Sequence, residues 1–152
     1  MIAERIAHAV ETQGLLPDNH FRARKQRSTE QVLIILQEQI YKAWRAGKVL
    51  SLVSFDVKGA YNGVYKERLL QRLQAQGIPQ ILVHWIEDFC SEQTATIQVN
   101  GYTSKQETLP QAGLPQRSPL SPILFLFFNA DLVQYKIDSR DRTIAFVDNY
   151  TV

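Results

Sequence analysis

Two apolar runs of β type, each ending on a single aspartate, constrain the fold of this chain more than any other feature. The run KVLSLVSFDV, residues 48–57, is apolar on both faces and contains Asp56. That pattern predicts a central strand covered on both sides. The run RTIAFVD, residues 142–148, predicts a last strand that ends at Asp148. If the two strands are neighbours, both carboxylates project from the same edge of one sheet into one cleft.

Helical periodicity and stop signals account for most of the remaining chain. Apolar residues at helical spacing predict a first helix that ends before Gly14, and Ser28 with Gln31 has the spacing of a capping box at the start of a second helix that ends at Gly47. The dipeptide Asn100-Gly101 between alternating segments predicts a β-hairpin. Three further helices are predicted over residues 66–76, 80–93 and 118–137.

This order of elements predicts an α+β fold, with helices packed on one face of a small, largely antiparallel sheet. The length of 152 residues fits one domain, and we see no linker that would divide it. No apolar run reaches the roughly 20 residues of a membrane span, and the N-terminus has no signal-peptide core. The only cysteine is Cys90, which favours an intracellular setting. A net charge of +2 permits a nucleic-acid partner without requiring one.

The two aspartates admit two interpretations. A pair of carboxylates at one sheet edge can hold Mg²⁺, which prefers oxygen ligands and keeps contacts to substrate phosphates. In the plainer interpretation, Asp56 caps the loop that follows it and Asp148 belongs to a turn. Spacing alone favours the plainer interpretation.

Three segments in fixed order change that balance. SFDVKGAYNGV, AGLPQRSPLSPILFLFFNADL and AFVDNYTV resemble motifs A, B and C of the palm of reverse transcriptases, and HFRARKQRSTEQ resembles the block between fingers and palm. The similarity is closest to non-LTR retrotransposons of the kind found in fungal genomes. It implies a partial right-hand polymerase over residues 1–152, with connecting helices of the fingers in 1–47 and the palm in 48–152. It also implies a truncated copy that ends on half of a hairpin, with an unpaired last strand.

The resemblance assigns roles residue by residue. Asp56 and Asp148 match the metal-binding aspartates, and the carbonyl of Val57 lies beside them in the family. Tyr61 matches the aromatic gate against a ribose 2′-hydroxyl, although a purely packing role is an alternative. Gln116 matches the glutamine beneath the incoming nucleotide. The implied cofactor is Mg²⁺, with Mn²⁺ as a substitute.

The chain departs from the family pattern at several of these positions. Asn149 stands where a second aspartate is usual, which removes one negative charge from the metal site. Arg117 replaces the glycine of Pro-Gln-Gly-Ser, where it either obstructs the site or pairs with a phosphate. Arg22 and Gln26 also stand where relatives tend to have glycine. These differences suggest a decayed copy of an element.

The implied function is RNA-directed DNA synthesis, with an RNA template, a DNA primer and deoxynucleoside triphosphates as partners. The first alternative is an inactive remnant that binds nucleic acid weakly. The second is an RNA-dependent RNA polymerase, against which Tyr61 and the Leu-Pro-Gln run argue. Four cations of one loop either contact template phosphates or are simply solvated: Arg22, Arg24, Lys25 and Arg27.

Overall fold

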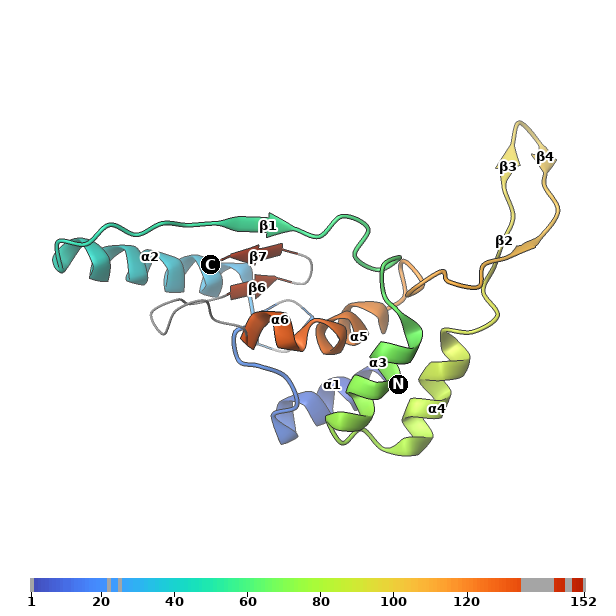
Figure 1. Cartoon of the computed structure of the whole chain (residues 1–152), viewed down its shortest axis with the longest axis horizontal. Coiled ribbons are helices and arrows are strands. Elements are labelled where there is room, and N and C mark those ends of the chain that lie inside the picture. Colours follow the sequence, from blue (N-terminus) through green and yellow to red (C-terminus); the bar gives the residue numbers. More distant parts are fainter. Residues whose placement is uncertain (1, 22, 25, 135–143, 147–148, 152) are drawn as a thin grey trace.

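The computed structural model describes residues 2–21, 23–24, 26–134, 144–146 and 149–151, the last two ranges by their backbone. Helices and short antiparallel strands are both present, so the predicted α+β class is confirmed (Figure 1). The helices are α1 (Ile2–Gln13), α2 (Thr29–Arg45), α3 (Lys66–Ala75), α4 (Gln80–Phe89), α5 (Ser121–Phe128) and α6 (Ala130–Gln134).

The hydrophobic core is built by helices around α5. This helix has the sequence SPILFLFF, and Ile123 to Phe127 are all buried, as expected of a helix that is apolar on every side. The other helices contribute Ile6 and Val10 from α1, Leu69 and Leu73 from α3, and Val83 and Ile86 from α4. The core therefore joins the N-terminal helix to segments more than a hundred residues further along the chain.

Most helix ends follow the sequence signals. Ser28 and Gln31 exchange the two bonds of a capping box at the start of α2, and Gly47 follows its end with φ of +64°. Two predicted helices are shorter than expected. The helix predicted over 80–93 ends at Phe89, and the helix predicted over 118–137 begins at Ser121 and is interrupted at Asn129.

The predicted central strand is wrong in two respects. Only Ser54–Asp56 forms a strand, β1, and it lies at one side of a three-stranded antiparallel sheet in the order β1, β7 (Asn149–Thr151), β6 (Ile144–Phe146). Every residue from 48 to 56 is exposed, including Val49 at 95% and Phe55 at 57%. An apolar run indicates that a strand is hydrophobic, but it does not show which other elements cover that strand. No described helix covers β1.

The last strand is paired, which corrects the expectation of half a hairpin with an unpaired strand. β7 is hydrogen-bonded to β6 on one side and to β1 on the other, both antiparallel. Phe146 pairs with Asn149 across the β6–β7 hairpin. Val147 and Asp148, which connect these two strands in the chain, lie outside the described residues.

The hairpin predicted at Asn100-Gly101 is confirmed. Strands β3 (Gln98–Val99) and β4 (Tyr102–Thr103) pair across it, and both turn residues have positive φ, at +49° and +82°, as a two-residue hairpin turn of type I′ requires. Nearer the helices, β2 (Thr94–Ala95) pairs with β5 (Glu107–Thr108). Figure 1 shows that these strands form an arm, residues 94–108, that extends away from the helices.

Candidate active site

The last residue of β1 and the first residue of β7 are paired in the sheet. Asp56 is the last residue of β1, and its Cα partner in the antiparallel register is Asn149, the first residue of β7. The sequence left open whether the strand ending in Asp148 would be the neighbour of β1. β1 instead neighbours the strand that follows Asp148, so the position directly opposite Asp56 is the one that departs from the family pattern.

The side chain of Asp56 is accessible to a ligand. It is exposed, and no described residue forms a hydrogen bond or ion pair with its carboxylate. Val57 follows it, is half-buried and packs against Val133 of α6. A free carboxylate beside a backbone carbonyl supplies the hard oxygen donors that Mg²⁺ prefers.

These two donors do not make a complete metal site. No group of three His, Cys, Asp or Glu residues that could hold a metal ion occurs among the described residues. The second carboxylate that the sequence predicts for this site lies outside the described residues. Asp148 is the residue that the sequence analysis supplies for that position.

Tyr61 lies in the loop between β1 and α3 and packs on the core. Its ring meets Phe125 edge to face, with ring centroids 5.5 Å apart and an interplanar angle of 70°. This contact fits the packing interpretation of Tyr61, and it also holds the ring in a defined place. Its role as a gate stays a prediction.

The segment Gly113–Arg117 lies against the loop that carries Tyr61. The amide of Leu114 donates to the carbonyl of Tyr61 at 2.9 Å, and Leu114 is buried. Gly113 has φ of +68°, and a Cβ atom added there would lie 2.1 Å from the same carbonyl oxygen. Only glycine allows this approach, so Gly113 fixes the distance between the two segments that the sequence analysis assigned to motifs A and B.

Gln116 is brought close to this loop. It is exposed, and its Nε2 lies 3.4 Å from Oδ1 of Asn62, the residue after Tyr61. Ser121, at the start of α5, is buried and donates from Oγ to the carbonyl of Pro115 at 2.5 Å. The structure thus brings Tyr61 and Gln116 into one neighbourhood, on the loops that follow β1 and precede α5.

Two of the departures from the family pattern have backbones that suit glycine. Arg117 has φ of +63° and Gln26 has φ of +61°, a region in which side chains with a Cβ are strained. Arg117 is exposed. Arg22 lies outside the described residues.

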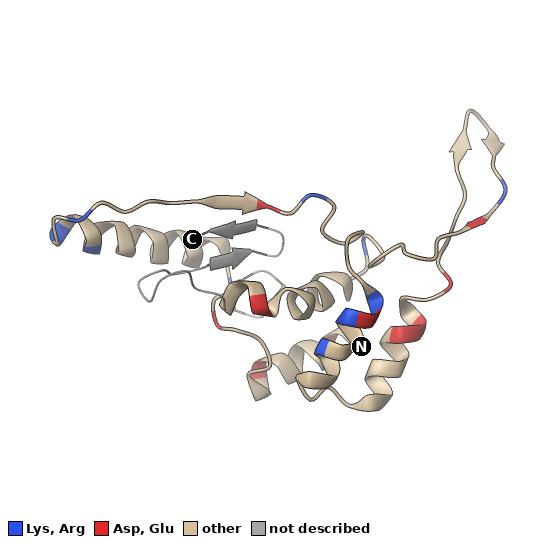
Figure 2. Cartoon of the chain, in the orientation of Figure 1, with Lys and Arg blue, Asp and Glu red and all other residues tan. Residues whose placement is uncertain are grey.

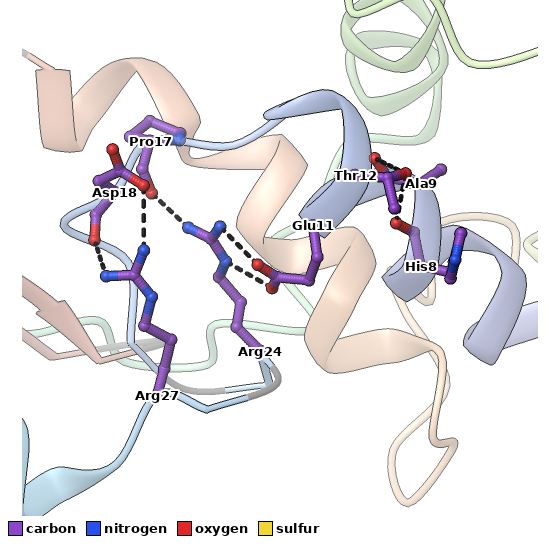
Figure 3. Close-up of polar contacts among 8 residues, drawn as sticks. All are labelled: His8, Ala9, Glu11, Thr12, Pro17, Asp18, Arg24 and Arg27. Atoms are coloured by element: carbon purple, nitrogen blue, oxygen red, sulfur yellow. Dashed lines mark hydrogen bonds and ion pairs between the residues drawn. The ribbon is translucent and has the colours of Figure 1, made fainter.

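Arg24 does not fit the predicted phosphate-binding loop. Its side chain is only 3% exposed, and Nε and Nη2 form a bidentate ion pair with Glu11 at 2.9 and 3.1 Å. Nη1 donates to the carbonyl of Pro17 at 2.7 Å (Figure 3). The guanidinium is therefore used to attach the loop to α1, which is a structural role that the sequence analysis did not consider.

Arg27 also has partners inside the protein. It bonds both the backbone and the carboxylate of Asp18, at 2.8 and 3.0 Å, and its side chain is 27% exposed (Figure 3). Lys25 lies outside the described residues. In Figure 2 the basic residues are spread over several elements and do not form one stripe. Among the described residues the case for a basic nucleic-acid surface is correspondingly weak.

Three residues that shape this site are not among those predicted from the sequence: Gly113, Asn62 and Gln93. Gln93 donates from Nε2 to the carbonyl of Gly113 at 3.0 Å. The signal for Gly113 was present, because a glycine within an apolar segment often marks a close backbone approach. Nothing in the sequence pattern indicates the partners of Asn62 or Gln93, because these contacts join segments that are 20 or more residues apart.

None of the described helices combines the length and the apolar content that crossing a bilayer requires. The fold and site together define an α+β domain in which the loop after β1 meets the loop before α5, and β1 ends on an exposed carboxylate. Over residues 1–152 the chain matches the reverse transcriptase (RNA-dependent DNA polymerase) family. The chain belongs to this family, and the resemblance found in its motifs is confirmed.

Individual relatives agree with the family. The chain is 25% identical over 134 residues to a probable RNA-directed DNA polymerase from transposon X-element of Drosophila melanogaster, covering 88% of this chain and 14% of that protein. It is 26% identical over 154 residues to the RNA-directed DNA polymerase from mobile element jockey of the same species, covering 95% and 16%.

A third relative comes from another insect. A Pol polyprotein from type-1 retrotransposable element R2 of Popillia japonica is 30% identical over 92 residues, covering 60% of this chain and 13% of that protein. The chain thus spans about one sixth or less of the length of these relatives. All three are insect proteins, and the affinity to fungal elements stays a prediction.

Proposed function

We propose that this chain is the palm, with part of the fingers, of the reverse transcriptase of a non-LTR retrotransposon, and that its reaction is RNA-templated DNA synthesis. The observation that supports this best is the pairing of Asp56 with Asn149, because it sets the aspartate of motif A opposite a residue of motif C, the one that follows Asp148 in the chain. In the proposed division, residues 1–47 are connecting helices and 48–152 are the palm. The packing of α1 on α5 gives both parts one core.

Asp56, Asp148 and the carbonyl of Val57 are the proposed ligands of Mg²⁺, or of Mn²⁺ in its place. The exposed carboxylate of Asp56, free of described partners, supports this assignment. Bound metal ions would activate the primer hydroxyl and neutralise the leaving pyrophosphate.

The nucleotide is proposed to lie between the loops that carry Tyr61 and Gln116. The ring of Tyr61 is held by Phe125, so it can reject a ribose 2′-hydroxyl by contact rather than by rearrangement. Gln116 has a side-chain amide that can both donate and accept hydrogen bonds beneath the nucleotide. An RNA template and a DNA primer are the proposed partners, and the names of the relatives agree with this.

Two substitutions are proposed to impair this activity. Asn149 removes a negative charge from the position opposite Asp56, and its amide offers hydrogen-bond donors where a metal requires acceptors. Loss of one preorganised electrostatic group costs about 10²–10³ in rate. Arg117 adds a long side chain and backbone strain beside Gln116.

The test is primer extension on an RNA template with Mg²⁺ and then Mn²⁺. It compares the unaltered chain with Asn149→Asp, Arg117→Gly and the double variant, and Asp56→Ala is the blank. We expect the double variant to extend at least about 100-fold faster than the unaltered chain. Equal and measurable extension by the unaltered and double variants would show that the two substitutions do not impair the site. Extension by the blank would remove Asp56 from the mechanism.

The second candidate function is that of an inactive remnant that binds nucleic acid weakly. The positive φ at both Arg117 and Gln26 favours it, because both positions have replaced glycine by residues that fit the backbone poorly. This candidate predicts binding to RNA–DNA duplexes that weakens steeply with salt, without synthesis by any variant.

A further inference from the structure

Gly113 is held from two opposite sides. On one side, its Cα lies against the carbonyl of Tyr61, and the next residue, Leu114, donates to that carbonyl at 2.9 Å. On the other side, Nε2 of Gln93 donates to the carbonyl of Gly113 at 3.0 Å, in a partly buried hydrogen bond. Gly113 is thus fixed between the Tyr61 loop and a residue from the base of the arm.

Residues 110–114 are not fully packed on the side that faces α3. Between residues 110–114 and the start of α3 lies a cavity of about 170 Å³, lined among others by Val64, Lys66 and Cys90. A segment that borders a cavity has fewer atoms to restrain it than one in a filled core. The hydrogen bond from Gln93 is therefore an important restraint on Gly113.

The turn that precedes Gln93 is held to α4 and α3 by hydrogen bonds. Two residues earlier, Ser91 donates to the carbonyl of Glu87 in α4 at 2.6 Å and accepts from Lys66 of α3 at 3.2 Å. Glu92 has φ of +51°, a strained conformation for a residue with a side chain. This turn directs the chain from α4 into the arm and places Gln93 against Gly113.

We propose that Gln93 is a positioning residue for the candidate active site. Its side chain holds Gly113, and Gly113 precedes Gln116 by three residues, so Gln93 sets where Gln116 lies relative to Tyr61. The consequence for nucleotide binding rests on the proposed function, whereas the restraint on the segment does not.

The chemistry of the side chain is specific. The carbonyl of Gly113 needs a donor, which the amide of Gln93 provides and a carboxylate does not. Gln93→Glu keeps the size and turns the attraction into repulsion between two acceptors. Gln93→Met keeps the length of the side chain and removes the hydrogen-bond donor without introducing a charge.

Gln93 also connects the segment to the arm. Its backbone carbonyl accepts from the amide of Leu109 at 2.7 Å, just after β5. The two strands at the base of the arm are further joined by Gln106, which donates to Thr94 at 2.6 Å. A change in the position of the arm therefore acts on Gly113 through the side chain of Gln93 as well as through the backbone of residues 109–112.

The first test measures hydrogen exchange at the amide of Leu114 in the full chain. A net hydrogen bond is worth about one kcal/mol, so we expect Gln93→Glu and Gln93→Met to accelerate this exchange about 3- to 10-fold. Exchange in α5 should be unchanged. The matched control is Gln98→Glu, which makes the same replacement at an exposed position on β3 of the arm.

This test decides the positioning role of Gln93 even if the chain has no enzymatic activity. Faster exchange in the two Gln93 variants but not in Gln98→Glu supports the positioning role. Equal exchange at Leu114 in all variants overturns it. If Gln93→Glu does not fold, Gln93→Met decides alone, because it introduces no charge.

The second test measures the affinity for a deoxynucleoside triphosphate with Mg²⁺ by titration calorimetry. A Kd that rises about 3- to 10-fold in Gln93→Met, at an unchanged unfolding midpoint, is expected if the restraint serves the nucleotide. An unchanged Kd overturns this consequence. If neither the unaltered chain nor the double variant Asn149→Asp, Arg117→Gly binds a nucleotide, the proposed function is wrong, and the exchange measurement still decides the role of Gln93.

Discussion

Asp56 and Asn149 are directly opposite each other at the meeting point of β1 and β7. Residues that face each other in an antiparallel pair interact across the strands, and like charges at such positions are destabilising. On the proposed metal site, the pairing links stability to metal binding, because a second carboxylate at position 149 is tolerated best when a cation lies between the strands.

Asn149→Asp should make the stability of the chain depend on Mg²⁺. Without metal, we expect the unfolding midpoint to fall by about 1–4 °C, since opposed like charges cost a fraction of a kcal/mol to about 1 kcal/mol. Millimolar Mg²⁺ should reverse the loss. Differential scanning calorimetry measures both values. In the double variant Asp56→Asn, Asn149→Asp the dependence should vanish, and its persistence would place the ion elsewhere.

Gly113→Ala should destabilise the fold by about 3 kcal/mol or more, because the added Cβ meets the Tyr61 carbonyl and breaks the bond from Leu114. The matched control is Gly77→Ala. Gly77 has a similar φ of +77° but no atom within 4 Å of the added Cβ, so strain alone should cost about 1 kcal/mol. Urea denaturation compares the two, and equal losses would show that the close approach is absent in solution.

Arg117→Gly should stabilise the chain by about 0.5–1 kcal/mol, because relief of the strained backbone exceeds the extra entropy of glycine in the unfolded chain. Gln26→Gly should act in the same direction, since its φ of +61° is nearly the same. Arg117→Ala removes the long side chain but keeps the Cβ, and should give no such gain. Chemical denaturation distinguishes these cases, and a gain with alanine would assign the effect to the arginine side chain.

His20 should make the chain less stable in acid. It is fully buried, neither ring nitrogen has a hydrogen-bond partner among the described residues, and burial together with the charge of Arg24 lowers its pKa from the usual 6.5 to about 4. The unfolded chain then binds a proton between pH 6.5 and 4 that the folded chain does not. The free energy of unfolding should therefore fall by about 3 kcal/mol as the pH drops through this window.

His20→Phe tests this prediction, because it keeps a buried ring and removes the titration. Its free energy of unfolding should change less between pH 6.5 and 4 than that of the unaltered chain. His84→Gln, at an exposed position on α4, is the control for loss of a histidine elsewhere. If both variants keep the same dependence, other groups are responsible.

Local signals in the sequence predicted much of the secondary structure. The capping box at Ser28, the stop at Gly47 and the hairpin at Asn100-Gly101 all occur as expected, because each depends on residues that are close in the chain. The wrong element was the central strand of residues 48–57. Its apolar character was visible, but burial depends on which distant elements cover it.

The same distinction applies to the site. The sequence by itself identified the family through three ordered motifs, and the positive φ at Arg117 and Gln26 agrees with glycine as the usual residue there. Only the tertiary structure decided that Asp56 pairs with the strand beginning at Asn149, that Arg24 is used in an ion pair with Glu11, and that Gln93 holds Gly113. Motifs are local patterns that a sequence displays directly, whereas these contacts join segments far apart in the chain and exist only after the core has formed.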